Sequence, residues 1–166
     1  MTNTSTVEVS LAFILASIFT IPYAGRVLEW LRFRRTTKET PVHQRHGQLG
    51  EQAAKRFLLK AGLRFLVANY RTPHGEIDLV FKDRDCIAFV EVKTRTAGGW
   101  TRPAAAVNRG KKQRLSRSAL HFMRYIGRPA VAIRFDIIEV LLTSGRVIEL
   151  RHLPDAFSLS EPYRYH

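Results

Sequence analysis

Two carboxylates and one lysine occupy positions at which they could act together. The stretch Ala88–Arg95 reads AFVEVKTR and has the composition of a central β-strand, yet it contains Glu91 and Lys93. Successive side chains of a strand point to opposite faces, so Glu91 and Lys93 share one face of the sheet. Asp78 lies on the preceding predicted strand. A hairpin through a turn centred at Arg84 would place Asp78 near Val90 and beside Glu91.

This combination suits metal-assisted hydrolysis of a phosphodiester. Mg²⁺ is usually held by one or two carboxylates and several waters. The bound cation lowers the pKa of a water and offsets charge on the phosphoryl oxygens, and a lysine can stabilise the transition state. A cross-strand ladder of ion pairs on an exposed sheet face has the same spacing. The spacing alone leaves both interpretations open.

The elements that must position these residues can be predicted from periodicity. Apolar residues at helical spacing indicate two helices, and alternation with intervening turn residues indicates five strands. In the second predicted strand, Ile77, Leu79 and Phe81 should share one face, and Asp78 and Val80 the other. The predicted order is helix Gly47–Ala61, strands Arg64–Tyr70, Glu76–Lys82 and Cys86–Thr96, helix Pro103–Ile126, and strands Ala130–Leu142 and Arg146–Leu150.

Several motifs recur in one order along the chain. They are GQLGEQAA (Gly47–Ala54), NYRTPHGEIDL (Asn69–Leu79), FVEVKTR (Phe89–Arg95), VNRGKKQRLSRSA (Val107–Ala119) and RFD (Arg134–Asp136). This pattern strongly resembles the YraN-like family, which looks like Holliday-junction resolvases of the PD-(D/E)XK nuclease superfamily. The resemblance implies an α/β fold with a restriction-endonuclease-like core, α-β-β-β-α-β, in which helices flank a mixed sheet.

The resemblance also implies roles for individual residues. The superfamily aspartate falls on Asp78 and its E-x-K motif on Glu91 and Lys93, and a resolvase-type helix glutamate falls on Glu51. These four would be catalytic, and Asp78 and Glu91 would hold Mg²⁺ or Mn²⁺. Glu76 matches the family pattern as a weaker ligand candidate. The sequence departs from the superfamily at Ile77, where the name-giving proline is absent.

Charge points to a polyanionic partner. The chain has 27 basic and 14 acidic residues and a formal net charge of +13. Nucleic acid is the leading interpretation, because Lys and Arg contacts to phosphates release counterions, and an anionic membrane surface is the alternative. We expect Trp100 and Arg102 to contact bases or to anchor a loop. The nucleic-acid-binding residues are expected on the second helix: Lys111, Lys112, Gln113, Arg114 and Arg117.

The first forty residues differ from the rest. Val9–Gly25 carries no charge and is slightly shorter than a typical membrane span. A membrane anchor, a buried or peripheral helix and a spurious extension all fit this pattern. The expected organisation is an apolar segment and basic linker over 1–43, an endonuclease-like domain over 44–155 and a tail over 156–166. We expect His43–His46 to be a basic loop, because no further Cys or His completes a zinc set.

The single cysteine, Cys86, cannot form an intramolecular disulfide and is expected to be a small buried residue. It is consistent with a reducing compartment, which favours a cytoplasmic protein, with a membrane-anchored cytoplasmic domain as the alternative. The leading hypothesis is an Mg²⁺-dependent endonuclease acting on structured DNA. A catalytically silent nucleic-acid-binding module and a membrane-tethered basic scaffold are the alternatives. A homodimer would suit the cutting of paired strands.

Overall fold

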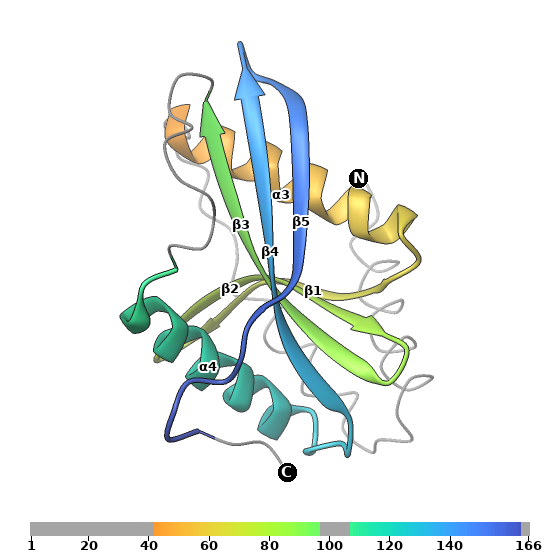
Figure 1. The fold of residues 1–166 in the computed structure, drawn as a ribbon, viewed down its shortest axis with the longest axis vertical. Helices are drawn as coiled ribbons and strands as arrows, with labels where there is room; N and C mark the ends of the chain where they lie inside the picture. The colour runs from red at the N-terminus through yellow and green to blue at the C-terminus, as the bar shows by residue number, and fades with distance from the viewer. Residues whose placement is uncertain (1–41, 97–106, 164–166) are drawn as a thin grey trace, which may run out of the picture.

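The computed structural model describes residues 42–96 and 107–163. The predicted order of helix, three strands, helix and two strands is confirmed (Figure 1). The elements are α3 (Val42–Lys60), β1 (Arg64–Thr72), β2 (Gly75–Asp83), β3 (Cys86–Thr96), α4 (Arg109–Tyr125), β4 (Ala132–Thr143) and β5 (Arg146–Phe157).

The strands form a single five-stranded sheet in the order β1-β2-β3-β4-β5. Neighbouring strands are antiparallel except for β3 and β4, which are parallel and are joined through α4. A parallel pair needs such a crossover because its strands start at the same edge of the sheet. The mixed sheet with its two helices confirms the predicted α/β class and is consistent with a restriction-endonuclease-like core.

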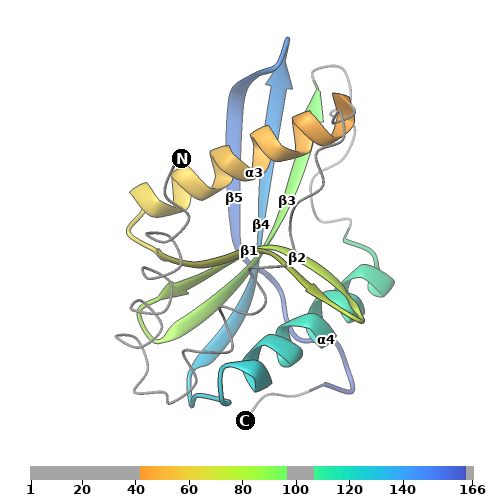
Figure 2. The same ribbon diagram turned by 180° about the vertical axis from the view of Figure 1, so that it is seen from behind.

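Each helix covers its own hydrophobic core. Helix α3 lies behind the long strands β3, β4 and β5 in Figure 1 and in front of them in Figure 2. Its core includes Ala54, Leu58 and Val90, whereas Leu115, Phe89 and Phe135 belong to the core that packs against α4. Phe89 and Val90 therefore face opposite helices, as the alternation of β3 predicts.

Some boundaries differ from the prediction. Helix α3 begins at Val42, so the interpretation of His43–His46 as a loop is wrong. Strand β5 continues to Phe157, beyond both the predicted strand end at Leu150 and the expected domain end at 155. The β4–β5 register shifts between Phe135 and Ile137, which accommodates Pro154 within this edge strand. The buried Phe157 fastens the end of the strand to the core beside α4.

The alternation predicted for β2 is also wrong at one point. Ile77 lies in the core beneath α4, whereas Leu79 lies in the core beneath α3. The break falls at Asp78, opposite Asn69 of β1, whose backbone has a φ of 51°. A left-handed residue interrupts the regular pleat, so Asp78 sits where the faces of the strand exchange.

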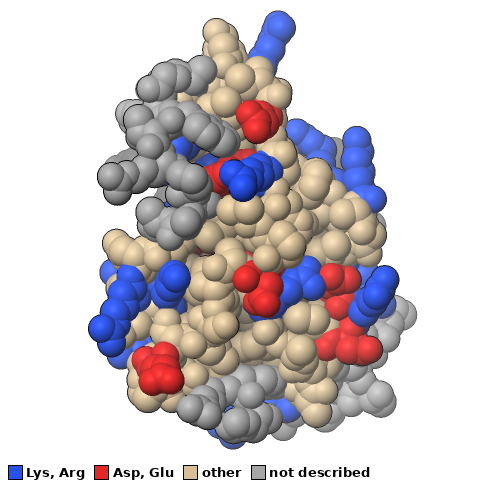
Figure 3. Space-filling view, viewed as in Figure 1, with Lys and Arg blue, Asp and Glu red and all other residues tan. Residues whose placement is uncertain are grey.

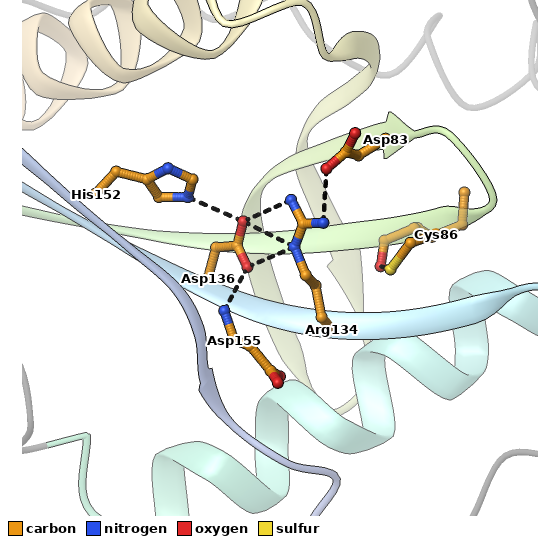
Figure 4. Close-up of polar contacts among 7 residues, drawn as sticks. Asp83, Cys86, Arg134, Asp136, His152 and Asp155 are labelled. Carbon is orange, nitrogen blue, oxygen red and sulfur yellow. Dashed lines mark hydrogen bonds and ion pairs between the residues drawn. The ribbon is translucent and has the colours of Figure 1, made fainter.

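A polar network on the α3 side joins three strands (Figure 4). Arg134 donates from Nη1 to Asp83 Oδ2 at 2.7 Å and from Nε to Asp136 Oδ1 at 3.0 Å. Asp136, which is fully buried, also accepts from the backbone N–H of Asp155 and pairs with His152 Nε2, both at 3.0 Å. The network fixes the β2–β3 hairpin and the end of β5 to β4.

The environment of this network changes two pKa values. Burial would raise the pKa of Asp136, but hydrogen bonds from His152, Arg134 and the backbone N–H of Asp155 outweigh burial and lower it. Cys86 is half-buried beside Arg134, so it is less buried than the sequence predicted. Partial burial is the largest influence on this thiol and raises its pKa.

Neither α3 nor α4 is long and apolar enough to cross a membrane, and these are the helices within the described residues. The apolar stretch 9–25 and the loop residues Trp100 and Arg102 lie outside the described residues.

Candidate metal and nucleic-acid site

The two central carboxylates meet where the β2–β3 ladder ends. Leu79 pairs with Val90, and continuing this register places Asp78 opposite Glu91. The sequence-based register, with Asp78 near Val90, is therefore wrong by one residue, because Asp83 pairs with Cys86 and the turn contains only two residues. The backbone N–H of Val92 donates to Asp78 Oδ2 at 2.7 Å, so the carboxylate of Asp78 is fixed directly to β3.

Glu91 is almost completely buried, with 4% of its surface exposed, and two lysines contact it. Lys93 Nζ donates to Oε1 at 2.7 Å, and Lys111 Nζ of α4 lies 3.0 Å from Oε2. The second contact is an ion pair without hydrogen-bond geometry, so Glu91 Oε2 lacks a hydrogen bond in the described part of the chain. The ammonium of Lys111 therefore balances the charge of Oε2 but leaves this buried oxygen without a hydrogen bond, which is costly.

Helix α3 brings a third carboxylate to the same end of the sheet. Asn69 Nδ2 donates to Glu51 Oε2 at 2.8 Å and also lies 3.5 Å from the backbone oxygen of Asp78. The helix can approach so closely because residue 50 is glycine: a Cβ there would lie 1.8 Å from Thr94 Oγ1. The close approach of α3 to β3 thus determines where Glu51 stands.

Burial, together with neighbouring negative charge, raises the pKa of Asp78 from its usual 3.8 to about 7. Burial is the largest cause, and the neighbouring negative charge of Glu91 adds to it. The hydrogen bond from Val92 and the positive charge of Lys111 act in the opposite direction, and Glu51 raises the pKa slightly further. Asp78 therefore changes its protonation near neutral pH, as groups at functional sites often do.

A cavity of about 450 Å³ lies between the start of α3 and the end of β3. Asp78 and Glu91 border it, while Lys93 and Lys111 contact Glu91 beside it. Figure 3 shows acidic and basic side chains side by side on the face above α4, over the long strands. The cavity is lined by His46, Gly47, Glu51, Asp78, Glu91, Val92, Thr94, Arg95 and Thr96.

The residues present fit a hard divalent cation. Asp78 and Glu91 offer carboxylate oxygens, and a cation bound to Glu91 would take the place of a lysine ammonium that now contacts it. No group of three or more His, Cys, Asp or Glu side chains within residues 42–96 and 107–163 is arranged to hold a metal ion. Two carboxylates completed by waters are the arrangement that Mg²⁺ commonly takes, so Asp78 and Glu91 would hold it.

The predicted nucleic-acid-binding residues separate into two groups. Lys111 reaches the acidic site, and the ammonium of Lys112 lies 5.3 Å from the centre of the Phe157 ring. Arg114 and Arg117 are exposed, Gln113 is half-buried, and the side chain of Arg117 donates to the hydroxyl of Tyr163. Basic side chains also gather over the start of α4 in Figure 3.

Asn69 and Glu139 lie at the site but were not predicted from sequence, whereas the predicted candidate Glu76 lies apart from the site. Asn69 contacts Glu51, and its only signal in the sequence is a turn-type residue inside an apolar strand. Glu139 of β4 is buried next to Lys93, and its signal is a charge inside the apolar run Ile137–Leu142. Glu76 forms an exposed 3.0 Å ion pair with Arg71.

Comparison with known proteins places the same region in one group of sequences. The family model described as "Uncharacterised protein family UPF0102" matches residues 50–140. A UPF0102 protein of Trichlorobacter lovleyi is 43% identical over 119 residues, which cover 71% of this chain and 94% of that relative. The chain is also similar to UPF0102 proteins of Desulfosudis oleivorans (39% identical, 68% and 92% covered) and Nocardia farcinica (42% identical, 67% and 87% covered).

Proposed function

The chain belongs to the uncharacterised protein family UPF0102, and we propose that it is an Mg²⁺-dependent endonuclease that hydrolyses phosphodiester bonds in structured DNA. The observation that carries the proposal is the meeting of Asp78, Glu91 and Lys93 at one end of a central hairpin. Residues from both strands of the hairpin converge there, as a catalytic site requires.

Burial distinguishes this site from a surface ion-pair ladder. Exposed pairs on a sheet contribute tenths of a kcal/mol and need no shielding from water. Here Glu91 is buried and the pKa of Asp78 is raised to about 7, so the fold holds a carboxyl group whose ionisation is unfavourable beside a buried carboxylate. Such a cost is typical of sites that bind a cation or carry out acid–base chemistry.

The residues of the site can divide the hydrolysis among them. Mg²⁺, when bound, would lower the pKa of a water and offset charge on the phosphate oxygens. Asp78 and Glu91 would hold the cation, and Lys93 is close enough to Glu91 to place its ammonium beside the same phosphate. Glu51, held by Asn69, adds negative charge at the cavity edge and can orient a water there.

Helix α4 suits the binding of the DNA backbone. Its first turns carry Lys111, Lys112 and Arg114, and the exposed Arg117 follows one turn later. Lysine and arginine contacts to phosphates position a nucleic acid without reading its sequence. Because Lys111 also contacts Glu91, a phosphate bound at the start of α4 would lie next to the carboxylates. The resemblance to Holliday-junction resolvases supports branched DNA as the substrate.

The test is a cleavage assay with the full chain. Purified protein is incubated with Mg²⁺ or Mn²⁺ and with four-way junction, flap, nicked and single-stranded DNA of matched length. We expect metal-dependent cleavage of at least one branched substrate, and we expect Asp78→Ala to abolish it. Asp85→Ala, which removes an exposed carboxylate from the adjacent turn, is the matched control and should cleave normally. Equal cleavage by wild type and Asp78→Ala would refute the proposal.

A silent nucleic-acid-binding module is the second candidate, and the two lysines on Glu91 favour it. Lys93 and Lys111 together neutralise Glu91 without a metal ion. Salt-sensitive binding of DNA that is unchanged by EDTA, with no cleavage of any substrate above, would support this function. Metal-dependent cleavage would exclude it.

We also propose that the active form is a homodimer on its DNA. Cutting two paired strands is served by two sites related by two-fold symmetry. Sedimentation of the protein with a four-way junction should give two chains per junction. One chain per junction at saturating protein would contradict this assembly.

A further inference from the structure

Glu139 is a buried acidic residue that has no role in the proposed hydrolysis. It lies in the middle of β4, and 6% of its surface is exposed. Its Oε2 has no hydrogen-bond partner in the part of the chain that the structure describes. A buried carboxylate normally satisfies its oxygens, because an unmade hydrogen bond to a charged group is costly. Glu139 therefore offers an oxygen for a cationic group.

The sheet places Glu139 next to Lys93. In the parallel register of β3 and β4, Lys93 is the direct partner of Glu139 and Glu91 is the partner of Ile137. Partners on adjacent strands point to the same face, so Glu91, Lys93 and Glu139 share the face that α4 covers. On its other side Glu139 has Arg151 of β5 as partner. Among the described residues, neither Lys93 nor Arg151 forms an ion pair with Glu139.

We propose that Glu139 is a positioning residue that receives the ammonium of Lys93 when Glu91 binds a divalent cation. This inference rests on the proposed function, because it concerns the same site. Without a cation, Lys93 Nζ donates to Glu91 Oε1 at 2.7 Å. With a cation, that oxygen becomes a ligand and Lys93 loses its partner. Glu139 then provides a negative oxygen one strand away, on the same face.

Reach and charge support this exchange. Adjacent strands lie about 4.8 Å apart, which a lysine side chain can span by changing its rotamer. The side chain of Lys93 is 35% exposed, so it has room to move. A divalent cation on Glu91 repels the ammonium, whereas the buried Glu139 attracts it. Lys93 then remains at the site, where it can contact a bound phosphate, and does not turn into solvent.

A double-mutant cycle on Mn²⁺ affinity tests the proposal without cleavage. Calorimetry measures the Kd for Mn²⁺ in wild type, Glu139→Gln, Lys93→Met and the double variant. We expect Glu139→Gln to weaken Mn²⁺ binding about tenfold when Lys93 is present, since Lys93 then has no carboxylate to move to. In the Lys93→Met background the same substitution should change the Kd less than twofold. Glu149→Gln, an exposed glutamate on β5, is the control for charge.

Each outcome decides the inference. If Glu139→Gln weakens Mn²⁺ binding equally with and without Lys93, Glu139 is a direct ligand or a structural residue. If Glu139→Gln weakens Mn²⁺ binding in neither background, Glu139 does not act at the site. Both outcomes overturn the proposal. Failure to bind Mn²⁺ in wild type overturns it together with the proposed function. Coupling with Lys93 but no DNA cleavage overturns the proposed function alone.

A spectroscopic measurement keeps the proposal testable if Glu139→Gln does not fold. The carboxyl ¹³C resonance of Glu139 should shift when Mg²⁺ is added to wild-type protein, because the ammonium of Lys93 arrives. The shift should disappear in Lys93→Met and persist in Arg151→Met, which removes the other neighbour of Glu139. A shift that persists without Lys93 overturns the exchange.

Discussion

Replacing Asp78 with asparagine should change how the stability of the metal-free protein depends on pH. The folded structure raises the pKa of Asp78 from 3.8 to about 7, through burial first and the charge of Glu91 second. Asparagine has nearly the same shape as the protonated aspartate, and its Oδ1 can still accept the N–H of Val92. The substitution therefore removes the ionisation and keeps the neutral contact.

The sign follows from where protons are bound. Between pH 4 and 7 the folded state retains a proton on Asp78 that the unfolded state has released, so its free energy of unfolding falls as pH rises. The stabilisation of the folded state by protonated Asp78 is complete below pH 4 and is lost as the pH rises through 7. A pKa difference of about three corresponds to about 4 kcal/mol, at roughly 1.36 kcal/mol per pKa unit. Asp78→Asn should lack this loss.

Urea unfolding in EDTA from pH 4 to pH 8 measures the effect. The free energy of unfolding of Asp78→Asn, minus that of wild type, should rise by up to about 4 kcal/mol across this range. Asp85→Asn, in the exposed turn, should give a curve parallel to that of wild type. Parallel curves for Asp78→Asn and wild type would refute the assignment of Asp78 as the group that ionises near neutral pH. With excess Mg²⁺ the wild type alone should gain stability above pH 7, because the cation binds only its folded state.

Three further predictions concern other parts of the fold. Gly50→Ala should lower the free energy of unfolding by about 1–3 kcal/mol, because the new Cβ would lie 1.8 Å from Thr94 Oγ1. Adding Thr94→Ala should restore part of the lost stability, and a Gly50→Ala variant as stable as wild type would contradict this packing. Asp136→Asn should lower the free energy of unfolding by about 1–3 kcal/mol, because it removes the charge of a fully buried carboxylate that accepts from Arg134, His152 and the backbone N–H of Asp155. An unchanged midpoint in urea unfolding would show that the network is not stabilising. Replacing Arg114 and Arg117 with glutamine should make DNA binding less sensitive to salt. The slope of the logarithm of the association constant against the logarithm of salt concentration should fall by roughly 0.9 for each phosphate that these arginines neutralise. An unchanged slope would show that DNA does not bind at these arginines of α4.

The order of the elements and the meeting of Asp78 with Glu91 could be predicted from sequence. Strand β3 was predicted at its observed bounds, because an apolar run rich in strand-forming residues and the turn residues on either side define it. The convergence of Asp78 with Glu91 was predicted from the hairpin, although the register was wrong by one residue. A two-residue turn and a three-residue turn differ by one position in register, and the sequence around Arg84 does not distinguish them.

The features that could not be predicted depend on contacts between distant segments, which no local sequence pattern indicates. The change of face at Asp78 depends on the left-handed backbone of Asn69 in another strand. Glu139 becomes a neighbour of Lys93 only because β4 pairs with β3 in a parallel register, which is set by the crossover through α4. The continuation of β5 past Pro154 depends on a bulge that places Phe157 against the core. Each of these features joins segments that are far apart in the chain.

The irregular backbone at Asn69 has a second consequence, for how the molecule behaves at high concentration. β1 is an edge strand, and an edge with a regular row of free N–H and C=O groups invites another molecule to extend the sheet. The left-handed Asn69 and the bulge between Phe65 and Val67 interrupt that row. Pro154 and the left-handed Asp155 interrupt the row on β5, at the opposite edge. The distortion that orients Asp78 therefore also protects the protein against aggregation through the β1 edge of the sheet.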